Sequence, residues 1–241
     1  MSIQEDLIID VGMHYGNDTD FYLKKGFRVA AIEANPELVS KARIKFKEAL
    51  AEGRLKIFEV GIYKEEGIFD FYINISKDDW SSLIEEVGTR QNTEYHVIKV
   101  KCTTFDKILS EVGIPYYLKI DIENADIYAL EALRDFEFKP KYVSIEAHSL
   151  DYLCLLRSFG YTKFKVVNQA RNIDVKCPNP PLEGVFVDQK FNGLSSGPFG
   201  EESPGPWLTL EEAAYEWLHL HMGHSERSSL GEGWYDFHAK I

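Results

Sequence analysis

Residues 7–36 constrain the fold of this chain more than any other stretch. Residues 7–10 (LIID) have the composition of a short buried strand, and a glycine turn (GMHYG) follows. The next segment has the apolar side of a helix, and a second strand over residues 27–32 stops at an acid, Glu33. Strand, glycine turn, helix, strand and acid, in this order, are the first βαβ unit of a nucleotide-binding sheet.

The charge around the glycine turn indicates which nucleotide this unit binds. Asp10, Asp18 and Asp20 surround the turn, which itself contains no Lys or Arg. A pyrophosphate needs free backbone N–H groups without nearby anions, whereas an acidic turn suits a cation. S-adenosylmethionine carries a sulfonium and an ammonium group and no phosphate, and Glu33 is placed to accept both ribose hydroxyls. The alternative is an α/β domain whose tight turn binds nothing.

Two motifs in this chain resemble those of the FkbM-type methyltransferases. The first is D-V-G-x-x-x-G-x-D-T, ending at Thr19, with E-A-N-P beginning at Glu33. The second is L-K-I-D-I-E, ending at Glu123, which resembles the family signature K-I-D-x-E-G-x-E. Asn124 replaces the glycine of that signature and Asp126 replaces its last acid. Because Asn tolerates the left-handed backbone better than most residues, the turn can survive this exchange.

The resemblance covers about residues 7–190 and implies a class I methyltransferase fold. This is a Rossmann-like α/β fold with a doubly wound, mainly parallel sheet, and it implies S-adenosylmethionine as donor and usually a hydroxyl as acceptor. We therefore interpret residues 1–190 as the S-adenosylmethionine-binding domain. Residues 191–241 are too short for a core of their own, so we expect an extension that packs on this domain or forms a lid.

The remaining pattern alternates predicted strands and helices, as expected for an α/β fold with a mainly parallel sheet. Further helices are expected over residues 37–51, 104–112, 125–133, 150–159 and 208–220. Further strands are expected over residues 55–60, 116–120 and 141–146. Two antiparallel pairs are also expected: residues 67–75 with 96–101, and an edge hairpin of residues 164–167 with 185–187.

Composition and charge limit the possible partners and location. The net charge of −12 opposes a nucleic acid substrate, because phosphate contacts need a basic surface. No run of eighteen apolar residues predicts a membrane span, and the N-terminus lacks the features of a secretory signal. Three scattered cysteines suggest neither a disulfide framework nor a metal site. We expect a cytoplasmic protein that acts on a small molecule or glycan, and its oligomeric state is left open.

The candidate cofactor contacts lie in the glycine turn and at the ends of the predicted strands, where the ligand crevice of such a sheet opens. A side chain at Gly12 is expected to occupy space that the ligand needs. Ser82 belongs to a serine pair that resembles one in the family, although helix capping explains it equally well. The candidates are Asp10, Gly12, His14, Gly16, Asp18, Thr19, Glu33, Ala34, Gly61, Ile62, Ser82 and Asp121.

Methyl transfer from a sulfonium is an in-line displacement that needs an aligned acceptor and a group to take its proton. His148, Glu146 and Glu123 follow the ends of the predicted central strands and are the candidate catalytic residues. His148 is the first choice because an imidazole titrates near working pH. The alternative for His148 is a surface position or a helix cap, which would pass the role to the carboxylates.

No metal site is expected from the sequence. Asp121, Glu123, Asn124 and Asp126 could offer oxygen ligands to magnesium, but residues so close in sequence rarely all converge. The histidines at positions 219, 221 and 224 lack a Cys or acid to complete a zinc set. The expected activity is O-methylation of a hydroxyl on a sugar, glycan or secondary metabolite. The alternatives are an N-methyltransferase of the same fold and a nucleotide-binding module without catalysis.

Overall fold

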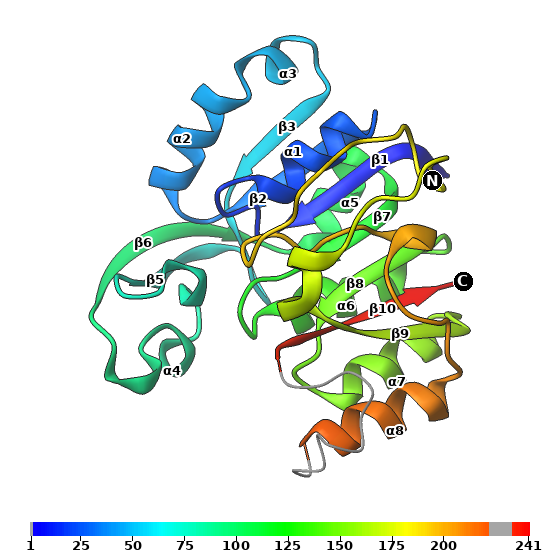
Figure 1. Ribbon diagram of the computed structural model, residues 1–241. Helices are drawn as coiled ribbons and strands as arrows, with labels where there is room; N and C mark the ends of the chain where they lie inside the picture. Colours follow the sequence, from blue (N-terminus) through cyan, green and yellow to red (C-terminus); the bar gives the residue numbers. More distant parts are fainter. Residues whose placement is uncertain (1, 222–232) are drawn as a thin grey trace.

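A seven-stranded, mainly parallel sheet forms the centre of the computed structural model, which describes residues 2–221 and 233–241 (Figure 1). In spatial order its strands are β3 (Leu55–Glu59), β2 (Arg28–Glu33), β1 (Ile3–Val11), β7 (Ile114–Ile120), β8 (Tyr142–Glu146), β10 (Tyr235–Lys240) and β9 (Lys163–Asn168). Neighbouring strands are parallel except that β10 runs antiparallel to both of its neighbours. The predicted α/β fold is confirmed, and its order reverses between β1 and β7.

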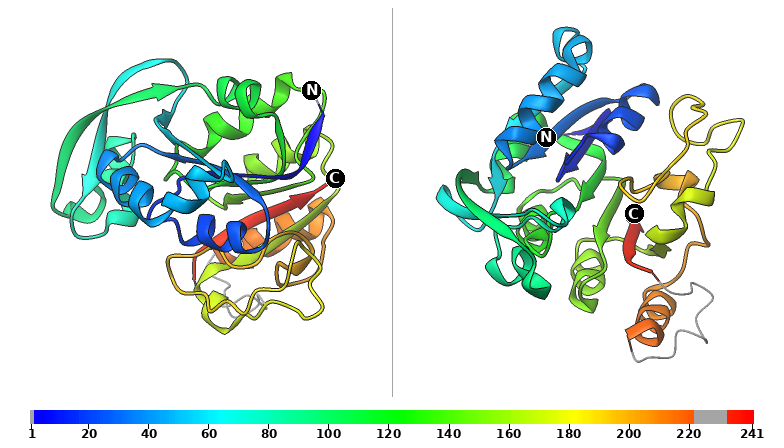
Figure 2. Two further views of the ribbon diagram at one scale, coloured as in Figure 1. Left: turned by 90° about the horizontal axis from the view of Figure 1, so that it is seen from above. Right: turned by 60° about the vertical axis from the view of Figure 1, so that its left-hand side comes forward.

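Helices cover both faces of this sheet and bury a separate apolar core on each (Figure 2). One face carries α5 (Phe105–Val112), α6 (Asp126–Ala132), α7 (Leu150–Ser158) and α8 (Leu210–His221). The other carries α1 (Asn17–Lys24), α2 (Pro36–Lys45) and α3 (Lys47–Ala51), together with Phe191 and Phe199. In β1, Ile9 faces the first core and Ile8 the second, because successive side chains of a strand point to opposite faces.

A smaller sheet projects from one end of the main sheet (Figure 1). It consists of β4 (Gly61–Ile62), β6 (Tyr95–Thr103) and β5 (Gly67–Asn74), with α4 (Glu85–Gly88) beside it. The predicted antiparallel pairing of residues 67–75 with 96–101 is confirmed by the register of β5 and β6. Short 3₁₀ helices lie at η1 (Asp78–Trp80), η2 (Arg90–Asn92), η3 (Leu133–Asp135), η4 (Gln169–Asp174) and η5 (Gly200–Glu202).

Local capping explains several of the helix boundaries. The Asn35 side chain accepts a hydrogen bond from the Glu37 N–H at 2.9 Å, and Pro36 occupies the first turn of α2. Thr209 and Glu212 form a reciprocal capping box ahead of α8. The helix predicted over residues 37–51 is instead two helices, because the backbone at Phe46 leaves the helical region.

Two predictions about the C-terminal part of the chain are wrong. Residues 185–187 form no strand, so the expected edge hairpin does not exist. The partner of β9 is β10, where no strand was expected from the sequence. Asp236 and His238 make this strand look solvent-exposed, yet both are buried, as are Phe237 and Ala239. Residues 191–241 therefore contribute a strand to the sheet itself.

None of the described helices is long and apolar enough to cross a membrane.

Candidate active site

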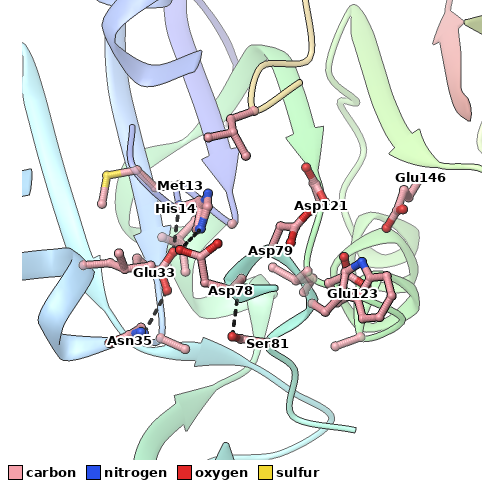
Figure 3. Close-up of a pocket in the computed structure, with 18 of the residues that line it drawn as sticks. Met13, His14, Glu33, Asn35, Asp78, Asp79, Ser81, Asp121, Glu123 and Glu146 are labelled. Atoms are coloured by element: carbon pink, nitrogen blue, oxygen red, sulfur yellow. Dashed lines mark hydrogen bonds and ion pairs between the residues drawn. The ribbon is translucent and has the colours of Figure 1, made fainter. Parts of the chain in front are cut away.

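A cavity of about 560 Å³ opens at the carboxyl ends of the central strands, beside the reversal of strand order between β1 and β7. Figure 3 shows Glu33 on one side of it and Glu123 and Glu146 on the other. The predicted site residues on its wall are Gly12, His14, Asp18, Glu33, Ala34, Gly61, Ile62, Asp121, Glu123 and Glu146. The predicted site residues that do not line it are Asp10, Gly16, Thr19, Ser82 and His148.

The glycine turn brings the end of β1 against the end of β7. A Cβ atom at Gly12 would lie 1.8 Å from the backbone oxygen of Asp121, and Gly12 has a φ of +89°. A side chain at Gly12 would therefore meet the end of the neighbouring strand first, and its effect on the ligand space stays a prediction. Gly12 is required for the close approach of two loops that both line the cavity.

Gly12→Ala is expected to lower the free energy of unfolding by about 3 kcal/mol or more, from overpacking plus the left-handed backbone. Gly53→Ala is the matched control, because Gly53 also has a positive φ of +70° but no atom within 4 Å of its missing Cβ. The control should cost only about 1–2 kcal/mol. Urea unfolding curves measure both, and equal losses would show that the contact with Asp121 is unimportant.

Glu33 joins the glycine turn to the end of β2. Its Oε2 accepts a hydrogen bond from the His14 N–H at 2.8 Å, and its Oε1 accepts one from the Asn35 N–H at 2.8 Å (Figure 3). Burial raises the pKa of the Glu33 carboxyl, and these two backbone hydrogen bonds oppose that rise. Because each carboxylate oxygen has a second lone pair, Glu33 can still accept hydrogen bonds from a ligand in the cavity.

A buried lysine neutralises the acids around the glycine turn. Lys119 Nζ lies 3.2 Å from Asp10 Oδ1, 3.4 Å from Asp121 Oδ2 and 3.7 Å from Asp18 Oδ2. Burial opposes its charge, but attraction by Asp10, Asp121 and Asp18 outweighs burial and raises the pKa of Lys119 well above its usual value. Asp10 also accepts a hydrogen bond from the Thr19 hydroxyl at 2.7 Å. Asp10 and Thr19 thus stabilise the glycine turn and do not line the cavity.

Sequence reasoning missed Lys119, although it is the lysine of the L-K-I-D-I-E motif. The glycine turn contains no Lys or Arg, so its acids suggested a cationic ligand. The structure shows that Lys119 of the neighbouring strand β7 supplies the positive charge. A charged residue inside an otherwise apolar strand was the available signal. A lone Lys in a buried strand needs an acidic partner, and Asp10 ends the neighbouring strand β1.

The C-terminal part of the chain covers the start of α1. The Ser196 N–H donates to both carboxylate oxygens of Asp18, at 2.9 and 3.1 Å, and the Asn17 side chain donates to the Leu194 carbonyl at 3.2 Å. Burial raises the pKa of Asp18 to about 6, against the opposing charge of Lys119. The stretch from Gly193 to Ser196 lines the cavity.

The opposite wall of the cavity holds Glu123 on a strained turn after β7. Its backbone has a φ of 52°, and its carbonyl accepts a hydrogen bond from the Ser82 hydroxyl at 2.8 Å. Its carboxylate lies 2.9 Å from Arg90 Nη1. Burial and the charges of Glu146 and Asp121 raise the pKa of Glu123 to about 8, although Arg90 opposes this. Ser82 therefore stabilises the turn at Glu123 through this hydrogen bond and does not itself line the cavity.

Glu146 and His148 form a hydrogen-bonded pair at the end of β8. The ring Nε2 of His148 lies 2.7 Å from Glu146 Oε2, and only Glu146 lines the cavity. Burial lowers the pKa of His148, but the hydrogen bond and charge of Glu146 outweigh it and raise that pKa to about 9. The structure thus places His148, the first choice for the base, behind a carboxylate and not on the cavity wall.

Two further segments reach the cavity that the sequence did not assign to it. The first contains η1, where Asp78 Oδ2 lies 3.5 Å from His14 Nε2 and Trp80 stacks with the guanidinium of Arg90, 4.1 Å from the ring centre. The second is β10 and the residue before it, which supply Asp236 and Trp234. No strand was expected over β10 from the sequence.

Comparisons with solved structures give remote similarities. An FkbM methyltransferase from Methylobacillus flagellatus KT is 16% identical, with a TM-score of 0.46, covering 69% of this chain and 40% of that one. A SAM dependent methyltransferase from Archaeoglobus fulgidus is 10% identical, with a TM-score of 0.43, covering 99% of this chain and 87% of that one. No curated protein sequence matches this chain significantly. This chain thus spans less than half the length of the Methylobacillus protein.

The sequence motifs are supported by a match to a protein family. The family described as the methyltransferase FkbM domain matches residues 10–161, which include the glycine turn, Glu33, Glu123 and Glu146. The match extends over more than half of the 241 residues. Together with the sheet topology and the cavity at its switch point, this match shows that the chain belongs to the FkbM methyltransferase domain family.

Proposed function

We propose that this protein transfers the methyl group of S-adenosylmethionine to a hydroxyl of a sugar, glycan or secondary metabolite. One observation carries the proposal: a single cavity has Glu33 at one side and the carboxylates of Asp121, Glu123 and Glu146 beyond it. These groups stand at or just beyond the ends of three central strands, where a doubly wound sheet binds its ligand.

The residues present suit the donor. Apolar side chains that could pack against an adenine line the same cavity as Glu33: Ile32, Leu38, Ile62, Phe71 and Leu83. Glu33 would accept the ribose hydroxyls, and Asp121, whose side chain is 45% exposed, would face the ammonium group. The donor supplies an electrophilic methyl group on a sulfonium, and it contains no phosphate for the acids to repel.

We assign removal of the acceptor proton to Glu123. It lines the cavity, Arg90 holds its carboxylate and Ser82 holds its backbone, so its position is fixed. A carboxylate with a pKa near 8 accepts a proton more readily than an ordinary one, which suits a general base. Glu146 is the second choice on the same wall, and His148 orients Glu146 from behind.

The acidic wall also favours the rival reaction, methylation of an amine, because carboxylates attract an ammonium group. Hydroxyl and amine acceptors offered together with labelled S-adenosylmethionine separate the two reactions by the linkage of the labelled product. Binding of the donor without transfer to any acceptor of either class would support the third alternative, a binding module.

Glu33→Ala is expected to weaken S-adenosylmethionine binding by about 1.5–3 kcal/mol, the range for hydrogen bonds to charged groups. That corresponds to roughly a 10- to 150-fold rise in Kd. Isothermal titration measures the effect, and Glu37→Ala is the control because Glu37 is an exposed acid four residues further along. A folded Glu33→Ala protein with wild-type affinity would remove Glu33 from the donor site.

A further inference from the structure

Three side chains with metal-ligating atoms converge beside the cavity wall. They are Asp126 at the start of α6, Glu146 at the end of β8 and His148 two residues later. One ligand atom from each lies within 4.8 Å of the others. Asp126 is buried and the other two are half-buried, so the group is not a chance collection of surface acids.

Asp126 supplies a second, independent observation that points to a ligand at this group. Its Oδ1 accepts a hydrogen bond from the Ile122 N–H at 3.0 Å. Within residues 2–221 and 233–241, its buried Oδ2 has no hydrogen-bond partner, and the residue is 0% exposed. A buried carboxylate oxygen without a partner is costly, and a bound cation would supply that partner.

The pairing of Glu146 with His148 fits the same interpretation. Their facing atoms, Oε2 and Nε2, are 2.7 Å apart, so both already point at a common region. Glu146 and Asp126 add two carboxylates to one imidazole, and a cation between them would offset the repulsion between the two acids. This set differs from the one considered from sequence, since Glu123 is turned toward Arg90 instead.

We propose that Asp126, Glu146 and His148 bind a divalent first-row transition metal ion, with Mn²⁺ as the representative. A mixed set of carboxylate oxygens and an imidazole nitrogen suits Mn²⁺, Fe²⁺ or Zn²⁺, whereas Ca²⁺ prefers oxygen ligands alone. Because Glu146 also lines the cavity, the ion would be within reach of an acceptor hydroxyl bound there.

The test is calorimetric titration of the metal-free full chain with MnCl₂, without S-adenosylmethionine or acceptor. We expect one equivalent of Mn²⁺ to bind, and Asp126→Asn and His148→Gln each to weaken binding by more than about tenfold. Asp126→Asn keeps an oxygen for the Ile122 N–H, so the turn should fold normally. Asp151→Asn and His96→Gln are the matched controls, since both residues are exposed and lie outside the group.

The proposal is overturned if the wild-type chain binds no Mn²⁺, or if both variants bind it as tightly as the controls do. Urea unfolding of each variant verifies that a loss of binding is not a loss of fold. Manganese binding is measured without methyl transfer, so the metal site and the methyltransferase activity can fail separately.

Discussion

Lys119→Met is expected to lower the free energy of unfolding by roughly 3–5 kcal/mol, the cost of breaking a buried ion pair on one side. The Lys119 ammonium is 4% exposed and lies among Asp10, Asp18 and Asp121. Asp10 is 0% exposed and Asp18 only 6%, so neither carboxylate can recover its lost partner from water. Chemical denaturation with urea measures the loss.

Lys56→Met is the control for Lys119→Met, because it removes a lysine from an exposed ion pair with Glu111. We expect it to change stability by less than about 0.5–1 kcal/mol. A similar loss in both variants would show that the buried network contributes no more than a surface pair.

The loss in Lys119→Met is also expected to depend on pH. Burial already raises the pKa of Asp18 to about 6, and Lys119 opposes this, so removing Lys119 should raise it further. A carboxyl group whose pKa is raised on folding stabilises the folded state while it is protonated. This stabilisation is lost as the pH rises through the pKa of the group in the folded state. The variant should therefore be closer to wild type at about pH 5 than at about pH 8.

Glu123→Gln is expected to lower the turnover number by roughly 100-fold to 10,000-fold, the contribution of a positioned general base. An amide cannot take the acceptor proton, but it has the shape of the carboxylate and leaves the Glu33 side of the cavity intact. S-adenosylmethionine affinity should therefore remain within a few-fold of wild type. Steady-state rates at saturating donor, together with titration of the donor, separate the two effects.

Glu131→Gln is the control for Glu123→Gln, since Glu131 is an exposed acid on the neighbouring helix α6. Glu146→Gln discriminates between the two candidate bases on the cavity wall. If Glu146→Gln loses the larger part of the rate while Glu123→Gln loses less than about fivefold, Glu123 is not the base. The contact between Arg90 and Glu123 would then stabilise the cavity wall and would have no part in proton removal.

The sequence by itself determined the first βαβ unit and the side of the sheet on which the cavity opens. Local backbone and side-chain chemistry specifies each part of this unit. The first strand ends in a turn where Gly12 has a positive φ, a helix follows, and the second strand ends at Glu33. The same holds for the alternating strands that pair as β5 and β6. Neighbours in the chain specify these features, so the order of residues was enough.

Only the tertiary structure decided which distant residues meet. Lys119 meets Asp10 because β7 pairs with β1, although 109 positions separate the two residues. The strand β10 is buried because it lies between β8 and β9 in the sheet. Its polar residues gave no indication of a buried strand. Asp126 and His148 converge because α6 and β8, which His148 follows by two residues, border the same apolar core. Strand order and packing set these contacts between residues far apart in the chain, so local patterns do not specify which residues meet.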